Sequence, residues 1–424
     1  MIGLMVLLVY IAVLLVSFLV VRFLVHRTTN DFTARKTVTF GDESAVVSNR
    51  FASTISVITI FVIWGSFTGS AWLPGFLHAP GPFVGDTAFN YTLESADGAR
   101  DDATVYVHVA GFGQETSKFT VDPGAGFAKD DAVSMNASRT ATILFDANDE
   151  TTRRDGARVV AIDGVTIGPE DSIRNDVGRF ALTDKGAISF TPPKGLQMEP
   201  IWLPAPEAVV GRMVEIANDG YRGSTLWGHL GYSLFRVVTG FILGALLGIP
   251  LGYAMGLSNW FRGWFEPIVE FMRPVPPLAL IPLVIIWFGI GETGKIILLF
   301  LASLWIMAIS ARAGVSGVNI AKVHVAYSLG ASKFQIMRYV IMPNSLPEIF
   351  TGARVAMGVC WGTVVAAELV AASEGAGMMI MVASKFQLTD IVLMGIILIG
   401  LIGFGIDILM RKAEKILVPW KGRS

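Results

Sequence analysis

Seven stretches of the chain are long and apolar, and polar segments separate them. A helix needs about 20 mostly apolar residues to cross a hydrocarbon core that is ~30 Å thick. The stretches cover residues 3–25, 52–74, 228–255, 264–290, 295–312, 348–371 and 388–410. This pattern predicts an α-helical polytopic membrane protein with about seven spans.

The segment between the second and third apolar stretches follows a different pattern. Short runs typical of β-strands occur at residues 104–112, 141–145, 157–167 and 186–193. Within the third run, Asp163-Gly164 is a pair that favours a type I′ hairpin turn. We therefore predict a small β-rich domain, a sandwich or barrel of about six strands, over residues 76–200.

The charges of the loops predict one orientation. Lys and Arg are frequent in the loop 313–347 and in the tail 411–424, and they are rare in the loops 290–294 and 372–387. Because positive loops stay on the cytoplasmic side, the C-terminus is expected inside and the N-terminus outside. A cleaved signal peptide at the N-terminus is the less favoured alternative, since no Lys or Arg precedes that apolar stretch.

Three regions follow from this topology. Residues 1–75 are expected to hold two helices joined by a cytoplasmic linker, 26–50. Residues 76–200 are expected to form the β-rich domain on the periplasmic side. Residues 201–424 are expected to hold the remaining five helices.

Composition agrees with a membrane protein. The chain has 53% hydrophobic and only 16% charged residues, where a soluble domain usually has about 25% charged residues. The net charge of −1 offers no basic surface for nucleic acid. The region from Asp86 to Glu199 is acidic, with 19 Asp and Glu against 11 Lys and Arg. This domain is either a solvated cap or a docking or gating module at the outer mouth of a pore.

The chain offers little chemistry for an enzyme. Residues 289–296, GIGETGKI, resemble a phosphate-binding loop, but Ile296 has no hydroxyl for Mg²⁺. The glycines are therefore interpreted as a tight turn between two spans. The single Cys360 excludes an internal disulfide, and the five histidines show no metal-ligand spacing. We expect no catalytic residue, no metal site and no cofactor in this chain.

One polar stretch between the third and fourth apolar stretches of the C-terminal region carries a motif. Residues 326–343 read AYSLGASKFQIMRYVIMP, an amphipathic pattern that predicts a helix over 324–343 on the cytoplasmic side. Ala326 and Gly330 would lie on one face of that helix. Phe334 would form an apolar knob, with polar neighbours on both sides. An amphipathic helix resting on lipid headgroups is the alternative.

The spacing of this stretch resembles the coupling-helix signature of ABC importer permeases, Glu-Ala-Ala, three residues, Gly, nine residues, Ile, one residue, Leu-Pro. Ala326, Gly330 and Pro343 match it, whereas His324 and Val325 stand where Glu-Ala is usual. The resemblance implies that a cytoplasmic ATPase contacts Ala326, Gly330, Ala331, Ser332, Lys333, Phe334, Gln335 and Pro343.

The resemblance extends over about 200–424. Residues 203–216, 229–258, 273–296 and 352–372 resemble the permeases that import taurine, aliphatic sulfonates, nitrate and bicarbonate. Residues 1–25 and 76–200 depart from that family. The resemblance implies a type I ABC importer fold in a bacterial inner membrane, with two permease copies working by alternating access.

The same resemblance implies the partners. Two cytoplasmic ATPases would bind ATP and Mg²⁺, and a periplasmic solute-binding protein would deliver a small, anionic solute. An importer of another small molecule, such as a vitamin precursor or an aromatic acid, remains an alternative. So does a membrane-anchored sensor or assembly protein whose β-rich domain is the functional part.

Candidate residues of the translocation pathway lie in the apolar stretches, where a charge or a broken helix often marks function. They are Arg273, Pro276, Pro277, Trp287, Trp361 and Glu368. Arg273 could instead pair with Glu270, and Glu368 could pair with Arg354 or a backbone group. Both tryptophans could serve packing alone. A glycine every four residues from Gly240 to Gly256 predicts close helix packing, static or sliding.

Overall fold

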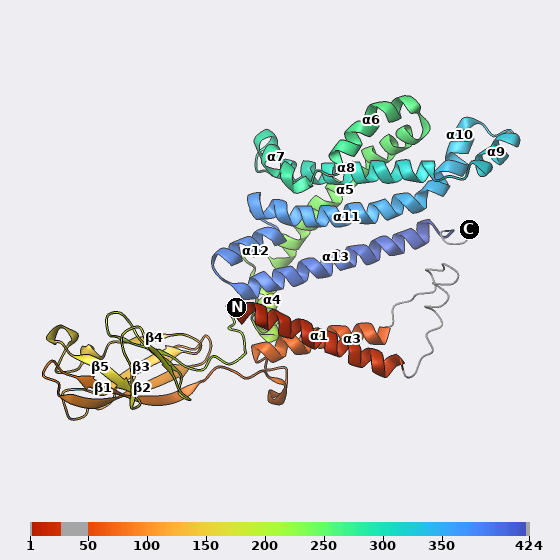
Figure 1. The fold of residues 1–424 in the computed structure, drawn as a ribbon. Helices are drawn as coiled ribbons and strands as arrows, with labels where there is room; N and C mark the ends of the chain where they lie inside the picture. Colours follow the sequence, from red (N-terminus) through yellow and green to blue (C-terminus); the bar gives the residue numbers. More distant parts are fainter. Residues whose placement is uncertain (1, 27–49, 421–424) are drawn as a thin grey trace. The chain divides into compact units, whose positions relative to one another are not determined.

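The computed structural model describes residues 2–26 and 50–420 (Figure 1). It forms two compact units, Met1–Ala208 and Val209–Ser424. The predicted linker 26–50 lies almost entirely outside the described residues.

The first unit begins with two apolar helices, α1 (Ile2–His26) and α3 (Arg50–Thr68), which pack against each other. Their described side chains are largely exposed, for example Leu15 at 55% and Ile58 at 55%, as expected of helices that face lipid. The second helix ends earlier than the predicted residue 74. Gly69 takes a left-handed conformation with φ +62, which terminates a helix, and a 3₁₀ turn, η2 (Gly75–Leu77), follows.

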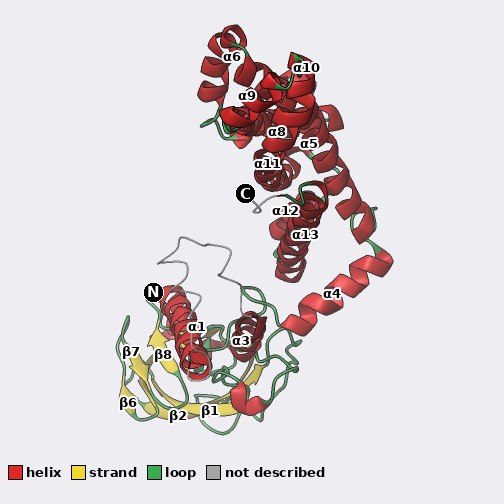
Figure 2. Ribbon diagram, turned by 90° about the vertical axis from the view of Figure 1, so that its right-hand side faces the viewer, coloured by secondary structure: helices red, strands yellow, loops and turns green. Residues whose placement is uncertain are grey.

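The β-rich domain is a sandwich of two sheets, drawn as yellow arrows in Figure 2. The larger sheet has the order β3-β2-β1-β5-β6, and the smaller has the order β4-β9-β8-β7. The strands are β1 (Gly85–Glu94), β2 (Arg100–Ala110), β3 (Asp131–Asn136), β4 (Ala141–Ile143), β5 (Arg158–Ile162), β6 (Val165–Thr166), β7 (Ser172–Arg174), β8 (Arg179–Leu182) and β9 (Ile188–Thr191). The prediction of about six strands was too low, since β1, β3, β7 and β8 lie outside the predicted runs.

Aromatic side chains join the two sheets. Phe89 on β1 lies 4.6 Å from Phe180 on β8 and 5.4 Å from Phe190 on β9, measured between ring centroids. All three are at most 2% exposed. Edge-to-face aromatic packing adds to the free energy of burial, so this cluster is the centre of the domain.

The predicted hairpin is confirmed. Asp163 and Gly164 have φ angles of 45 and 75 and connect β5 to β6, with Ile162 opposite Val165. Positive φ at both central residues is what a type I′ turn requires. The connection from β2 to β3 differs, because these two strands pair in parallel.

The second unit is helical. Its elements are α4 (Pro206–Asp219, which starts in the first unit), α5 (Leu226–Leu257), α6 (Asn259–Met272), η5 (Pro277–Leu280), α7 (Ile281–Phe288), α8 (Glu292–Ser316), α9 (Ile320–Ser328), α10 (Lys333–Ile336), η6 (Met337–Ile341), α11 (Met342–Ala371), α12 (Ala376–Lys385) and α13 (Thr389–Leu417). Figure 1 shows α8, α11 and α13 running side by side.

The glycine stripe of α5 packs closely on α8. A Cβ atom added to Gly248 would lie 2.6 Å from the carbonyl oxygen of Leu304, and Ser303 donates a hydrogen bond of 3.2 Å to the carbonyl of Gly240. The predicted close approach of two helices through small residues is therefore confirmed.

Among the described residues, five helices are long and apolar enough to cross a membrane. The fourth predicted span, 264–290, is not one continuous helix. It consists of α6 and the η5–α7 segment, bent by 91° at the break between them. Pro274, Pro276 and Pro277 fall at this break, where their missing N–H groups and rings prevent a continuous helix. Counting this pair as one span gives six, and Ile11–Leu24 adds a shorter apolar segment of α1.

Candidate functional site

The predicted coupling segment is a turn between two helices. The amide of Gly330 donates to the carbonyl of Tyr327 at 2.9 Å, and that of Ala331 donates to the carbonyl of Ala326 at 3.1 Å. This pair of bonds, with φ +85 at Gly330, is the Schellman arrangement that ends a helix. The expectation of one continuous helix over 324–343 is therefore wrong, because Gly330 ends α9.

The second helix of the turn starts two residues later. The Ser332 hydroxyl accepts from the amide of Gln335, and the Gln335 side chain accepts from the amide of Ser332. This capping box begins α10, which continues through the π-helical stretch η6 into α11. Pro343 lies in the first turn of α11 and is half-buried. A π-helical insertion of this kind is common at functional sites.

The turn exposes large apolar side chains. Tyr327 is 69% exposed, Leu329 83%, Phe334 73% and Tyr339 70%. Around Phe334, the side chains of Lys333 and Gln335 are also exposed. Exposed apolar groups gathered on one loop mark a surface for contact with another molecule. We call residues 325–339 the exposed turn.

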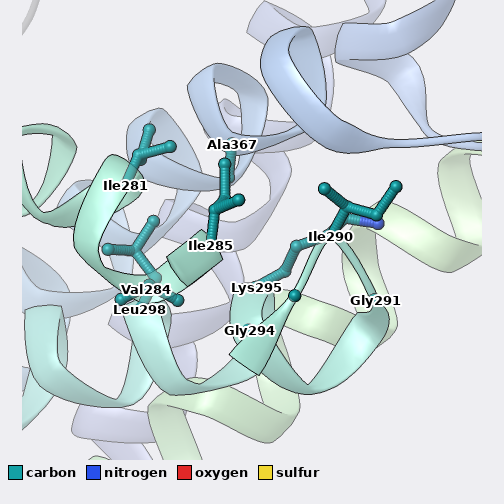
Figure 3. Close-up of a pocket in the computed structure, with 10 residues that line it drawn as sticks. Ile281, Val284, Ile285, Ile290, Gly291, Gly294, Lys295, Leu298 and Ala367 are labelled. Atoms are coloured by element: carbon teal, nitrogen blue, oxygen red, sulfur yellow. The ribbon is translucent and has the colours of Figure 1, made fainter. Parts of the chain in front are cut away.

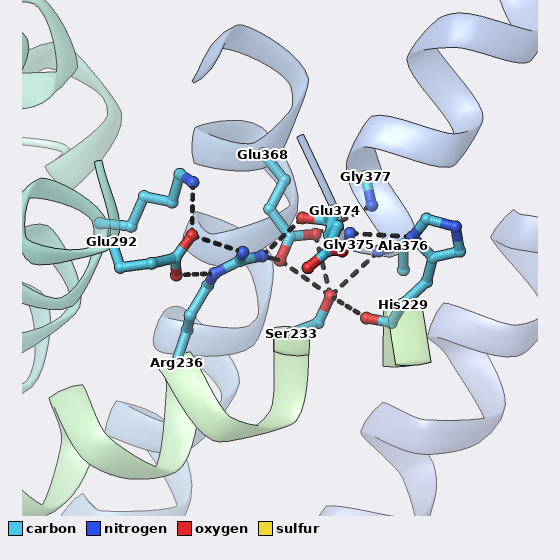
Figure 4. A network of polar contacts seen from close by, with 10 residues as sticks. His229, Ser233, Arg236, Glu292, Glu368, Glu374, Gly375, Ala376 and Gly377 are labelled. Atoms are coloured by element: carbon cyan, nitrogen blue, oxygen red, sulfur yellow. Dashed lines mark hydrogen bonds and ion pairs between the residues drawn. The ribbon is translucent and has the colours of Figure 1, made fainter. Parts of the chain in front are cut away.

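A buried network of charged side chains lies where α8 begins and α11 ends, at the ends of these helices that are far from the exposed turn (Figure 4). Arg236 of α5 is 1% exposed, and its guanidinium binds two carboxylates. Its Nη1 donates to Oε1 of Glu368 at 2.6 Å and to the backbone carbonyl of Glu374 at 2.8 Å. Its Nε and Nη2 donate to the two carboxylate oxygens of Glu292, at 2.5 and 2.7 Å.

Neighbouring groups complete the network. Lys295, 6% exposed, donates to Glu292 at 2.9 Å. The Ser233 hydroxyl donates to Glu368 at 2.8 Å, and the amide of Gly377 donates to Glu368 at 2.9 Å. His229 accepts from the amide of Gly375 through Nδ1, so its Nε2 donates to the carbonyl of Tyr221. Buried charges are stable only with such partners.

The structure corrects one predicted pairing. Glu368 has Arg236 and the backbone amide of Gly377 as partners, so a backbone partner is confirmed and Arg354 is not its partner. Arg354 instead lies 3.4 Å from Glu414. The sequence does carry a signal for Arg236, an arginine inside the long apolar stretch 228–255, which is costly in a membrane and therefore informative.

The other candidate pathway residues lie on separate elements. Arg273 is exposed and pairs with Glu270 at 3.6 Å, the predicted alternative. Trp361 is 7% exposed and donates to the carbonyl of Ile399 at 3.0 Å, so it takes part in packing. Trp287 is 62% exposed at the end of α7. Pro276 and Pro277 begin η5. Within the described residues, no hydrogen bond or ion pair joins any two of these side chains.

The loop resembling a phosphate-binding motif is a glycine turn between α7 and α8. Gly289 has φ +75, and Gly291 caps α8. Lys295 does not point freely into this loop, since its ammonium binds Glu292. The turn borders a pocket lined mainly by apolar side chains, including Ile281, Ile285, Leu298 and Ala367 (Figure 3). In the described part of the chain, no cluster of three or more His, Cys, Asp or Glu side chains has the arrangement of a metal site.

Comparisons with known proteins agree with this architecture. The model of the family "Binding-protein-dependent transport system inner membrane component" matches residues 240–416. The taurine transport system permease protein TauC of Escherichia coli (strain K12) is 47% identical over 226 residues, which cover 53% of this chain and 82% of that protein. This chain belongs to that permease family.

Two further similarities have the same extent. The putative aliphatic sulfonates transport permease protein SsuC of Escherichia coli (strain K12) is 39% identical over 218 residues, 51% of this chain and 81% of that protein. A solved structure of the MetNI methionine ABC transporter in an inward-facing conformation matches 47% of this chain and 97% of its own, with 19% identity and a TM-score of 0.37. The family model and the similarity to the taurine permease identify the chain as a multi-pass permease component of an ABC transporter. The match to these relatives covers about half of its length.

Proposed function

We propose that this chain is the membrane subunit of an ATP-driven importer for a small sulfonate, such as taurine. The observation that carries the proposal is the 47% identity to a taurine transport permease over 82% of that protein's length. The working unit is a permease homodimer with two cytoplasmic ATPases and a periplasmic solute-binding protein. ATP and Mg²⁺ bind to the ATPases, and this chain performs no chemical reaction.

The exposed turn is the docking site for the ATPase. Phe334 and Leu329 offer apolar anchors of the kind that fill a pocket on a partner, with Lys333 and Gln335 as polar contacts beside them. The turn is held rigidly at both ends, by the Schellman bonds of α9 and by the capping box of α10. Because the turn is rigid, movement of the bound ATPase would also move the helices on both sides of the turn.

Movement of the exposed turn would reach the other side of the membrane through α8 and α11. The 25 residues of α8 span roughly 37 Å at 1.5 Å per residue, and the exposed turn lies on the chain segment between α8 and α11. The buried network of Arg236 joins the far ends of the same two helices to α5. Movement of the turn is therefore expected to shift these helices as rigid bodies, and alternating access follows.

The orientation follows the positive-inside rule. The exposed turn and the C-terminus face the cytoplasm, and the β sandwich faces the periplasm. The Arg236 network then lies toward the periplasmic end of the permease. The β sandwich is an addition that the matched relatives give no role.

The decisive experiment isolates the chain from its host membrane in mild detergent and identifies bound proteins by mass spectrometry. We expect an ABC ATPase with the natural chain. Phe334→Ala should weaken its binding by roughly 30-fold, the ratio for ~2 kcal/mol lost at an interface anchor. Phe76→Ala is the matched control, since Phe76 is 84% exposed and is expected on the periplasmic side.

The outcomes separate the candidate functions. Recovery of no ATPase with the natural chain would reject the transporter and favour a membrane-anchored sensor or assembly protein. With the ATPase and the solute-binding protein recovered, uptake of labelled taurine into proteoliposomes tests the substrate. Uptake of a vitamin precursor or an aromatic acid in its place would retain the importer and reject the sulfonate.

A further inference from the structure

The carboxylate of Glu292 lies between two cations. Arg236 grips both of its oxygens, at 2.5 and 2.7 Å, and the ammonium of Lys295 lies 2.9 Å from Oε1 (Figure 4). A bidentate grip by arginine and a second cation beside it is the arrangement that proteins use to bind carboxylates, phosphates and other oxyanions. Here the ligand is a side chain of the protein itself.

Exposure differs sharply among the members of this group. The side chains of Arg236 and Lys295 are 1% and 6% exposed, whereas that of Glu292 is 48% exposed. The cations are therefore fixed inside the unit, and Glu292 is the member that can leave toward solvent. Its departure from the site requires only a rotation of its own side chain at the first residue of α8.

The guanidinium keeps its place when Glu292 leaves. Arg236 has two other acceptors, the fully buried carboxylate of Glu368 at 2.6 Å and the carbonyl of Glu374 at 2.8 Å. Glu368 is in turn fixed by Ser233 and by the amide of Gly377. Two N–H groups of Arg236 and the ammonium of Lys295 would then face the vacated position, with no buried carboxylate left without a cation.

An apolar pocket lies beside Lys295. Lys295 is the charged residue among its lining, which otherwise consists of glycines and apolar residues such as Ile285, Ile290 and Leu298 (Figure 3). Gly289 and Gly291, in the turn that leads into Glu292, also line the pocket. A small anion held by the two cations would lie next to this apolar surface, which suits a short aliphatic tail.

We propose that Arg236 and Lys295 form a binding site for an aliphatic sulfonate, which Glu292 occupies until the sulfonate displaces it. The inference deepens the proposed function, on which it rests, by naming the residues that bind the substrate's anionic group. Displacement would also cut the link from the start of α8 to α5, so that arrival of the anion loosens the periplasmic end of the permease.

The test compares Glu292→Gln with the natural chain, each in the full complex with its ATPase in lipid nanodiscs. A side chain held in place competes as if present at millimolar concentration or more. Its neutralisation should therefore tighten binding of ethanesulfonate by about tenfold or more, measured by calorimetry. Glu215→Gln is the matched control, because Glu215 is also a half-exposed carboxylate paired with an arginine, Arg212, and it should leave the affinity unchanged.

Lys295→Met provides an independent arm that leaves the bond between Arg236 and Glu292 intact. It should weaken binding of ethanesulfonate by about tenfold, which is ~1.4 kcal/mol. Sulfate should bind more weakly than ethanesulfonate to every variant, since it has no tail for the pocket. Equal affinity for sulfate and ethanesulfonate would show that the site binds anions without recognising an aliphatic tail. That result would reject an aliphatic sulfonate as the ligand.

Unchanged ethanesulfonate affinity in both Glu292→Gln and Lys295→Met would show a permanent structural ion pair and reject the inference. Recovery of the ATPase with each variant is measured in the same preparations. If the ATPase is retained and the anion affinity does not respond, the inference fails while the transporter stands. If the natural chain binds no ATPase, the proposed function fails first.

Discussion

Both units of this molecule hold carboxylates in polar clusters, but they surround them in opposite ways. In the helical unit, Glu368 and Glu292 face Arg236, and Lys295 adds a second cation. In the β sandwich, Asp131 and Asp149 both face the hydroxyl of Tyr91, at 3.5 and 3.3 Å. The first group is balanced in charge, and the second brings two acids together.

The difference shows in the protonation of the sandwich. Burial, reinforced by the neighbouring Asp149, raises the pKa of Asp131 to about 7. Burial also raises the pKa of Asp149 to about 6, against the hydrogen bond from the amide of Lys129. The pKa of Tyr91 is raised by burial and by both carboxylates, so the tyrosine stays protonated. A buried carboxylate therefore means either a permanent ion pair or a group that takes up a proton, depending on what faces it.

The largest expected effect is the loss of the ion pair between Arg236 and Glu368. Arg236→Gln leaves Glu368 buried without its cation, which typically costs about 3–5 kcal/mol. We expect a clearly lower midpoint of thermal unfolding for the protein in detergent. Arg262→Gln, which removes an exposed arginine paired with Glu266, should leave the midpoint nearly unchanged.

A double variant sharpens this test. Arg236→Gln combined with Glu368→Gln removes the unpaired charge, so it should be more stable than Arg236→Gln alone. If the double variant were as unstable as the single one, the uncompensated charge of Glu368 would not be the cause.

The next effect is a dependence on pH that is confined to the sandwich. Since the folded-state pKa values of Asp131 and Asp149 are raised, the folded domain keeps protons that the unfolded chain has already lost. Its free energy of unfolding should therefore fall as pH rises from about 4 to about 7, and level off above that. Between pH 5 and pH 8 we expect a loss on the order of 2 kcal/mol, smaller than independent shifts would give because the two acids interact.

Hydrogen exchange of peptides from residues 85–191, corrected for the intrinsic rate, measures this change in the full chain. The range begins at pH 5 because Asp146 and Asp155 have lowered pKa values, caused by hydrogen bonds from Arg153 and Thr152 respectively. Those groups contribute stability that is lost only as pH falls below their usual range. A sandwich that is equally or more stable at pH 8 would contradict the assignment.

A smaller effect is expected when the charge of Asp131 alone is removed. Asp131→Asn keeps a polar group beside Tyr91 and removes the charge, so it should raise the stability of the sandwich at pH 8 by about 1–2 kcal/mol. At pH 5, where Asp131 is protonated, the effect should nearly vanish. Asp97→Asn, at an exposed turn position, is the control and should change neither value.

The sequence predicts local features of this fold well and long-range ones poorly. The hairpin at Asp163-Gly164 and the break at Pro276 were predicted because neighbouring residues determine them. The pairing of Arg236 with Glu368 was not, since 132 positions separate the two residues and an apolar pattern does not indicate which helices meet. The end of α9 could have been predicted, because Gly330 followed by a Ser332 to Gln335 capping box marks a helix stop and a new start.

The smallest effect concerns the exposed turn, where backbone conformation rather than buried charge matters. Gly330 has φ +85 and open space around its Cα, so Gly330→Ala meets no clash and only backbone strain remains. The cost should be about 1 kcal/mol. Gly358 of α11 also has open space around it but lies inside a helix, so Gly358→Ala should instead stabilise the protein by about 0.5–1 kcal/mol. Opposite shifts of the thermal midpoint would show that Gly330 is required for its left-handed conformation. Shifts of the same sign would mean that α9 continues through Gly330 as one helix, and the rigid turn proposed to bind the ATPase would then not exist in this form.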